Sequence, residues 1–214
     1  MVMAQSLFIT LKHRHPGCEI DVVSPQWSLP VLERMPEVRQ GIALTVQHGK
    51  FSFAIRYRLG RSLRARNYSH AIVLPRSWKS ALVPYFAGVP VRTGYRGEMR
   101  FGLLNDIRGL DRSVLSQTVQ RYVAHAYDES EVSVSPPDVP HPVLHSDMEN
   151  TNRLLESLGL DLEKPVVGLM PGAEYGPAKQ WPLEYFAELA RLLVERGYHV
   201  WVFGSAKERT LGEE

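Results

Sequence analysis

One stretch of the sequence places two glycines, a glutamate and a lysine between two apolar runs. Residues 166–170 are apolar, "PGAEYGPAKQWP" follows at 171–182, and apolar residues then recur at helical spacing up to Gly197. A second apolar run ends at Gly204. This order predicts a βαβ unit whose first turn lies at the carboxyl ends of parallel strands. Such turns bind ligands, often phosphates at a helix N-terminus.

Lys179 is the residue of this turn that suits an anion. It lies at the entrance of the predicted helix 183–196. An ammonium group there adds its charge to the positive end of the helix dipole. Gly172 and Gly176 allow the backbone to approach a ligand. Glu174 suits a sugar hydroxyl or a helix cap. A surface lysine in a plain turn is the alternative.

A second group of candidate residues lies at the end of the second apolar run. Gly204 and Ser205 end it, and Glu208 follows at a distance that suits ribose hydroxyls. Dinucleotide-binding folds use an acidic residue after a strand in the same way. A lone acidic residue also occurs there without a ligand, so both interpretations stay open.

Cationic residues follow two predicted strands in the first half of the chain, 70–75 and 91–95. At the carboxyl ends of parallel strands they would line a cleft, where guanidinium groups bind phosphorylated ligands through paired hydrogen bonds. Salt bridges with Glu98 and Asp106 are the alternative, although we expect at least two arginines to face a ligand. The candidates are Arg76, Ser77, Lys79, Arg92, Thr93, Arg96 and Arg100.

Helices alternating with strands must position these groups, which favours parallel, doubly wound sheets. A proline-rich stretch at 133–145 predicts an interdomain linker. The expected domains are therefore 1–132 and 147–214, joined by 133–146. The predicted helices are 1–15, 27–38, 51–66, 77–88, 114–127, 148–158 and 183–196; the predicted strands are 19–24, 41–46, 70–75, 91–95, 166–170 and 198–203, with a structured loop at 96–112.

Composition excludes several classes of protein. The chain has 214 residues, 44% of them hydrophobic, and a net charge of +2, which is too small for bulk nucleic-acid binding. The single cysteine, Cys18, excludes an intramolecular disulfide. No run resembles a transmembrane helix or a signal peptide. These features predict a cytoplasmic protein.

Three segments carry a resemblance to a known family. Residues 74–106, 171–182 and 203–208 closely resemble the ADP-heptose:lipopolysaccharide heptosyltransferase II family, as do "MAQSL" near the start and "RMPEV" at 34–38. The resemblance implies an α/β fold of GT-B type. Two Rossmann-like, doubly wound domains would face a cleft, with the second domain incomplete in this chain.

The resemblance also implies an activity: transfer of heptose from ADP-L-glycero-D-manno-heptose to heptosyl-Kdo2-lipid A, with inversion. ADP-heptose is a substrate, and no metal or cofactor is expected. The first domain would hold the acceptor through the seven candidates named above. The second would hold the donor, with Lys179 stabilising its diphosphate. The implied donor residues are Gly172, Ala173, Glu174, Gly176, Lys179, Gly204, Ser205 and Glu208.

Other interpretations remain beside this one. The family's candidate general base is an aspartate that precedes the segment matching Met1, so we expect a chain truncated at both ends. A catalytically incomplete sugar-nucleotide or lipid A–core binding fragment is the first alternative. An NAD-dependent oxidoreductase is disfavoured, because no G-x-G-x-x-G follows a predicted strand. The basic face of helix 51–66 predicts either a solvated surface or peripheral contact with anionic lipid at the inner membrane face: Arg56, Arg58, Arg61, Arg64 and Arg66.

Overall fold

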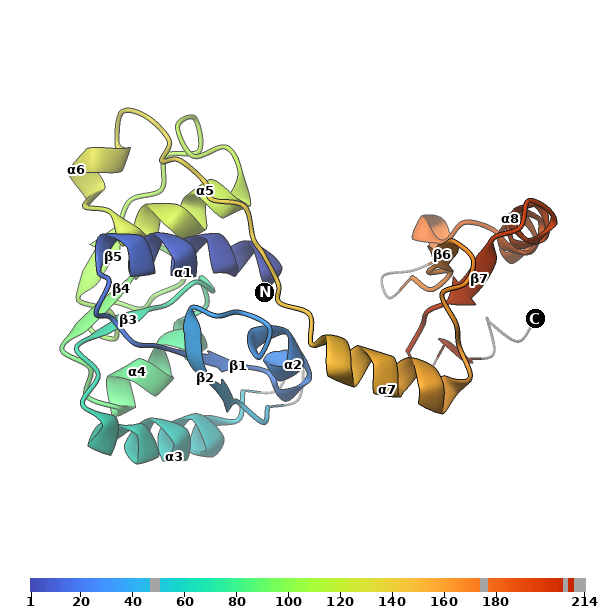
Figure 1. The fold of residues 1–214 in the computed structure, drawn as a ribbon. Coiled ribbons are helices and arrows are strands. Elements are labelled where there is room, and N and C mark those ends of the chain that lie inside the picture. The colour runs from blue at the N-terminus through green and yellow to red at the C-terminus, as the bar shows by residue number, and fades with distance from the viewer. Residues whose placement is uncertain (47–50, 174–176, 206–207, 210–214) are drawn as a thin grey trace. The chain divides into compact units, whose positions relative to one another are not determined.

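The computed structural model describes residues 1–46, 51–173, 177–205 and 208–209. The chain divides into two compact units, Met1–Ser146 (unit 1) and Asp147–Glu214 (unit 2) (Figure 1). Each unit contains parallel strands and helices, as the predicted α/β class requires.

Unit 1 contains two parallel sheets. In the three-stranded sheet β4 lies between β3 and β5, and Thr93 of β4 is in register with Asp106 of β5. In the two-stranded sheet β1 pairs with β2. All carboxyl ends within one sheet therefore meet at one edge. The strands are β1 Ile20–Ser24, β2 Val38–Ala43, β3 His70–Ile72, β4 Val91–Tyr95 and β5 Asp106–Arg108.

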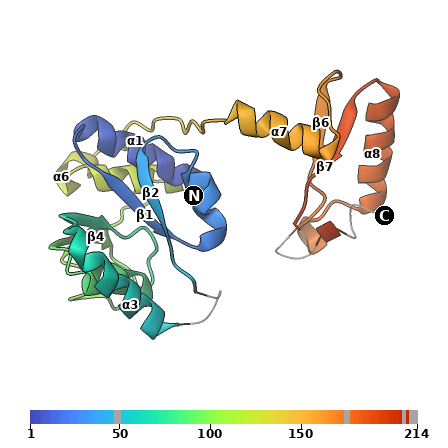
Figure 2. The same ribbon diagram turned by 60° about the horizontal axis from the view of Figure 1, so that its bottom comes forward.

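Helix α1 (Val2–Arg14) forms the centre of the unit 1 core (Figure 2). Leu7 and Phe8 are buried on it, and their cluster includes Leu32 and Met35. Residues of β1 and β3 pack on the same cluster, so one helix contacts both sheets. The remaining helices are α2 Leu29–Leu32, α3 Phe53–Leu63, α4 Leu82–Phe86, α5 Thr118–Val123 and α6 Glu129–Val132.

Unit 2 contains the predicted βαβ unit. Strand β6 (Val166–Leu169) pairs in parallel with β7 (His199–Val202), and α8 (Leu183–Glu195) connects them. Helix α7 (Met148–Leu158) precedes them with the predicted bounds. Asp147 caps α7 by accepting a hydrogen bond from the Asn150 amide at 3.0 Å, and Gly159 ends it at a φ of 63°.

Several predicted bounds in unit 1 are wrong. The helix predicted at 27–38 ends at Leu32, and the strand predicted at 70–75 ends at Ile72. The strand predicted at 41–46 runs from Val38 to Ala43, because a turn closed by Val38 N and Met35 O (3.1 Å) ends just before it. The helix predicted at 114–127 begins only at Thr118, where Gln117 forms a capping box with Gln120. The predicted loop 96–112 contains β5.

The proline-rich stretch 133–145 contains no helix or strand, yet it is held against unit 1. The Gln5 side-chain amide donates to the Val143 carbonyl at 2.6 Å. The His145 amide donates to the Arg34 carbonyl at 2.9 Å. These bonds fix the end of the stretch to α1 and to the turn after α2.

The predicted basic face is present only in part: Arg58 and Arg61 are exposed on α3, and Arg64 and Arg66 are exposed on the turn that follows it. Arg56 is buried, because its guanidinium donates to the backbone carbonyls of Phe51 (3.2 Å) and Lys79 (3.3 Å). Phe51 and Ile55 are exposed instead. Gly60 faces α4, where an added Cβ would lie 2.6 Å from the Cβ of Phe86. No helix in the described part of the chain is long and apolar enough to cross a bilayer.

Candidate functional site

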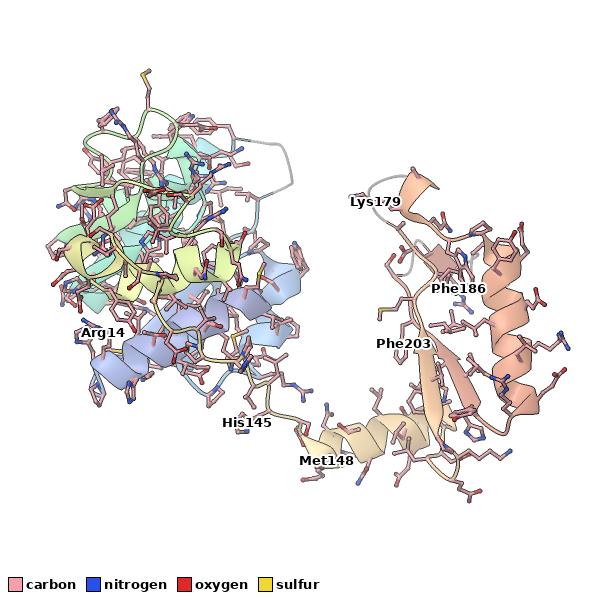
Figure 3. The ribbon with its side chains drawn as sticks, turned by 90° about the horizontal axis from the view of Figure 1, so that it is seen from above. Arg14, His145, Met148, Lys179, Phe186 and Phe203 are labelled. Atoms are coloured by element: carbon pink, nitrogen blue, oxygen red, sulfur yellow. The ribbon has the colours of Figure 1, made fainter. Side chains whose placement is uncertain are left out.

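The first candidate site lies in unit 2, after the carboxyl ends of β6 and β7. Lys179 ends the short 3-10 turn Pro177–Lys179, ahead of the first residue of α8, and its side chain is exposed. Figure 3 shows Lys179 at the end of unit 2 away from Met148. An exposed ammonium group is thus positioned near a helix N-terminus, as an anion site requires.

Gly172 and Glu208 bring the two strand ends of this site together. The Glu208 carboxylate accepts hydrogen bonds from the amide and the hydroxyl of Ser205, both at 2.7 Å. These bonds lower the pKa of Glu208 below its usual range. A Cβ on Gly172 would lie 1.9 Å from Glu208 Oε1, so only glycine fits beneath this carboxylate. Glu174 and Gly176 lie outside the described residues.

Aromatic side chains support the start of α8. Trp181 precedes the helix and packs edge-on against Phe186, with 4.9 Å between ring centroids. Figure 3 shows Phe186 projecting from α8 on the side of the sheet. The ring pair therefore fixes the segment between Lys179 and the helix.

The second candidate site is a pocket of about 660 Å³ in unit 1. It opens at the carboxyl ends of β4 and β5, where ligands bind in parallel sheets. Its charged side chains are Arg76, Arg108, Asp111, Arg112 and Glu129. The arginines outnumber the carboxylates, which suits an anionic or partly anionic ligand.

Arg108 is held rigidly in the pocket wall. Its guanidinium donates to Asp106 Oδ2 at 3.1 and 3.2 Å, and to the backbone carbonyls of Ala124 and Tyr127. Burial raises the pKa of Asp106, but hydrogen bonds from Thr93 and Arg108 more than offset this and hold the pKa below its usual value. The result is an oriented cation backed by an ionised carboxylate.

Tyr95 lines the pocket, and the buried His125 lies next to it. The Tyr95 hydroxyl donates to the Arg121 carbonyl at 2.9 Å, and burial raises the pKa of Tyr95 to about 12. The His125 ring lies 4.3 Å from the Tyr95 ring. Burial lowers the pKa of His125 to about 4, so its imidazole is neutral. Neither of its ring nitrogens has a hydrogen-bond partner in the described part of the chain.

Of the predicted acceptor residues, Arg76 lines this pocket. Its guanidinium donates to the Arg96 carbonyl at 3.0 Å. A Cβ on Gly97 would lie 2.3 Å from the Arg76 carbonyl oxygen, so glycine is required for this close approach. The Arg96 side chain is exposed. The Ser77 hydroxyl lies 2.6 Å from the Ser80 hydroxyl. Lys79 is half-buried.

Three predicted acceptor residues have structural partners in place of a ligand. Arg100 is only 2% exposed and donates to the backbone carbonyls of Pro75 and Tyr95. Arg92 and Thr93 lie inside β4 and do not follow it. Arg92 donates to the Leu103 carbonyl at 2.6 Å, and Thr93 donates to Asp106 at 2.7 Å. Polar partners inside the fold therefore occupy all three.

The sequence interpretation missed Arg108, Asp111, Arg112 and Glu129. Without β5, the segment containing the first three had no strand end to place it. The signal was the short run "DIR" at 106–108, in which an apolar residue lies between two charged ones. Among the described residues, no three His, Cys, Asp or Glu side chains are grouped as a metal site would need.

Comparison with known families shows which family the chain belongs to. The model of glycosyltransferase family 9 (heptosyltransferase) matches residues 56–214. The chain belongs to glycosyltransferase family 9. This family-9 chain is 47% identical over 218 residues to lipopolysaccharide heptosyltransferase 2 of Escherichia coli K12, and 45% identical over 220 residues to lipooligosaccharide heptosyltransferase 2 of Haemophilus influenzae. Both alignments cover 100% of this chain but only 62% and 63% of the relatives.

Solved structures confirm the GT-B-type α/β fold for this family-9 chain. The structure of E. coli ADP-heptose LPS heptosyltransferase II matches with a TM-score of 0.87 and 45% identity, covering 100% of this chain and 63% of that one. E. coli heptosyltransferase WaaC with ADP matches with a TM-score of 0.66 at 19% identity, covering 99% of this chain and 65% of that one. The second likeness shows the fold alone.

Proposed function

We propose that the chain is part of an inverting glycosyltransferase. It transfers L-glycero-D-manno-heptose from ADP-L-glycero-D-manno-heptose to the first heptose of the lipopolysaccharide inner core. The observation that carries this proposal is the 47% identity to a lipopolysaccharide heptosyltransferase 2 across the whole of this chain. Because the chain spans about 62% of that relative, the activity is proposed for the longer protein.

In the proposal, unit 2 binds the donor. Lys179 stabilises the negative charge that grows on the leaving diphosphate as the bond to the sugar breaks. Glu208, oriented by Ser205 and seated over Gly172, accepts hydrogen bonds from ribose hydroxyls. Ala173, Glu174, Gly176 and Gly204 complete the proposed donor turn.

Unit 1 binds the acceptor through its pocket. Kdo sugars and core phosphates are anionic, and guanidinium groups bind carboxylates and phosphates through two parallel hydrogen bonds. Arg76 and Arg112 supply these groups, and Arg108, whose guanidinium is bonded to Asp106 and to two backbone carbonyls, adds its positive charge to the pocket wall. Ser77, Lys79 and Arg96 extend the proposed acceptor surface from the neighbouring segments. The heptosyl-Kdo2-lipid A ligand is thereby aligned for transfer.

The proposal includes the setting of the reaction. ADP-heptose is a substrate, and the transfer uses no metal or cofactor. The protein acts in the cytoplasm, with peripheral contact at the inner face of the membrane, and does not bind nucleic acid. None of these 214 residues is proposed as the general base.

The test compares this chain with a version extended to the length of the E. coli relative. ADP-heptose binding is measured by calorimetry, and turnover is measured with heptosyl-Kdo2-lipid A. We expect both proteins to bind ADP-heptose and only the extended one to turn over. Binding without turnover in both supports the alternative, a sugar-nucleotide binding fragment. Failure of both to bind ADP-heptose contradicts the proposal.

Lys179→Ala in the extended enzyme tests the role of the ammonium group. Loss of one group that stabilises developing charge lowers kcat/KM by roughly 100-fold to 1,000-fold. Lys164→Ala is the matched control, because Lys164 is an exposed lysine of the same unit before β6. An unchanged kcat/KM for Lys179→Ala rules out the assigned role.

A further inference from the structure

A cluster of exposed aromatic side chains covers one face of α3 and α4. Phe53 lies 5.6 Å from Phe86 between ring centroids, and Phe51 lies 4.8 Å from Trp78. All members except the half-buried Phe86 are between 38% and 46% exposed. We call this cluster the aromatic patch; its members are Phe51, Phe53, Tyr57, Trp78, Tyr85 and Phe86.

The packing of α3 explains why these aromatic side chains are exposed. Arg56, Gly60 and Leu63 are the buried residues of α3. Phe53 and Tyr57 stay exposed at the edge of this buried side, where their rings contact Phe86 of α4. The edge-on and stacked rings hold one another in place. The exposed area is therefore a fixed, contiguous apolar surface, of the kind that marks an interaction site. Helices α3 and α4 lie side by side (Figure 1).

The charge of the surrounding chain identifies the partner. Residues 38–97 contain eleven arginines and lysines and no aspartate or glutamate. Arg58 and Arg61 are exposed on α3; Arg58 follows Tyr57 in the chain, and Arg61 lies about one helical turn after it. Arg64, from the turn that follows α3, donates to the Phe86 carbonyl at 2.8 Å. Aromatic rings beside arginines suit the headgroup region of an anionic bilayer, where rings enter the interface and cations pair with phosphates.

We propose that the aromatic patch, with Arg58 and Arg61, docks unit 1 on an anionic lipid surface. The inference deepens the proposed function and rests on it only for its setting, since a lipid-linked acceptor lies in a membrane. The residues differ from the basic face predicted from sequence, because Arg56 is buried and Arg66 is paired with Asp21 and Gln40.

The test uses the 214-residue chain and vesicles that contain no glycolipid. Sedimentation with phosphatidylcholine vesicles containing about one-third phosphatidylglycerol should retain the parent chain, while pure phosphatidylcholine should retain at least tenfold less. Arg58→Glu with Arg61→Glu should lower binding at least tenfold. Lys164→Glu with Arg196→Glu, two exposed cations of unit 2, makes the same change in net charge and should leave binding within twofold.

A second pair of variants separates docking from misfolding. Phe53→Ser with Tyr57→Ser should weaken vesicle binding about as much as the arginine pair, with the circular dichroism spectrum unchanged. Brominated lipids should quench the Trp78 fluorescence, measured as the signal lost in Trp78→Phe.

Equal binding by the parent chain and both α3 pairs overturns the proposal. So does binding lost equally in the unit 2 control, which would indicate a general charge effect. If the patch variants leave vesicle binding unchanged but abolish capture of a protein partner, the surface serves that protein instead. Vesicle binding does not depend on heptose transfer, so this test can be interpreted even if the proposed activity is absent.

Discussion

Arginines close in sequence have different roles, and their partners decide which. Arg100 is buried and bonded to backbone carbonyls, whereas Arg108 is anchored by Asp106 at the edge of an open pocket. Both are cations of the predicted loop 96–112. Whether a guanidinium faces a ligand depends on which carbonyls the loops place within reach. The sequence alone does not show which carbonyls these are.

Gly172→Ala should damage the donor site. An added Cβ would lie 1.9 Å from Glu208 Oε1, which forces this carboxylate away from Ser205. We expect ADP affinity of the 214-residue chain to fall about tenfold, or ~1.4 kcal/mol. Calorimetric titration with ADP measures it. Gly17→Ala is the control, because no atom lies within 4 Å of the Cβ it would gain. Equal affinities for parent and Gly172→Ala would falsify the steric argument.

His125 should make stability depend on pH. Burial lowers its folded pKa to about 4, below its ordinary value of 6.5, so the unfolded chain binds the proton more readily. The contribution of the neutral His125 to the free energy of unfolding is fully present above about pH 6.5. It is lost as the pH falls toward 4, which lowers the free energy of unfolding by up to about 3 kcal/mol. His125→Leu should lose this slope in urea titrations between pH 4 and 6.5. The lowered pKa of Asp106 acts at lower pH, so it does not mimic the effect. A parent chain without the slope contradicts the assignment.

At the scale of elements, prediction succeeded where local signals were complete. Helix α7 has a capping aspartate before it and a left-handed glycine after it, and both bounds were correct. Helix α5 was misplaced, because its apolar spacing extends upstream while Gln117 starts the helix. Strand β5 was missed because a single apolar residue between two charged ones is too short an alternation to predict a strand. Its pairing with β4, a contact distant in sequence, creates it.

Gly60→Ala should destabilise the contact between α3 and α4. The added Cβ would lie 2.6 Å from Phe86 Cβ and 2.7 Å from the Val83 carbonyl oxygen, so the helices must separate. Overpacking of this kind costs about 1–3 kcal/mol, measurable by urea unfolding. Ala54→Ser on the exposed side of α3 should change the free energy of unfolding by less than ~0.5 kcal/mol. Because alanine is a better helix former than glycine, a Gly60→Ala variant at least as stable as the parent would contradict the close-contact argument.

At the scale of the whole molecule, apolar burial is concentrated in unit 1. All three core clusters lie there, whereas Leu169 is the buried hydrophobic residue of unit 2 among those described. The sequence predicted two α/β regions correctly in kind. It could not show the unequal burial, because α8 is amphipathic whether or not its apolar face is covered.

Amide hydrogen exchange should follow this difference. Low apolar burial lowers the free energy of local opening. Amides of α7 and α8 should therefore exchange at least tenfold faster than those of α1, measured by mass spectrometry of the native chain. Exchange in ADP provides the control, because a ligand of unit 2 should protect α8 and leave α1 unchanged. Equal protection of α1 and α8 without ligand would mean that burial does not set the order.

The concentration of positive charge in residues 38–97 also affects how the chain binds to an ion-exchange resin. The net charge of +2 is a sum over the whole chain, in which carboxylates elsewhere offset the eleven cations of this stretch. A resin bead contacts one face of a protein at a time, so the local charge sets retention. The chain should elute from a cation exchanger at higher salt than its net charge suggests. Loss of a single exposed cation on α3 should shift its elution more than the same loss elsewhere.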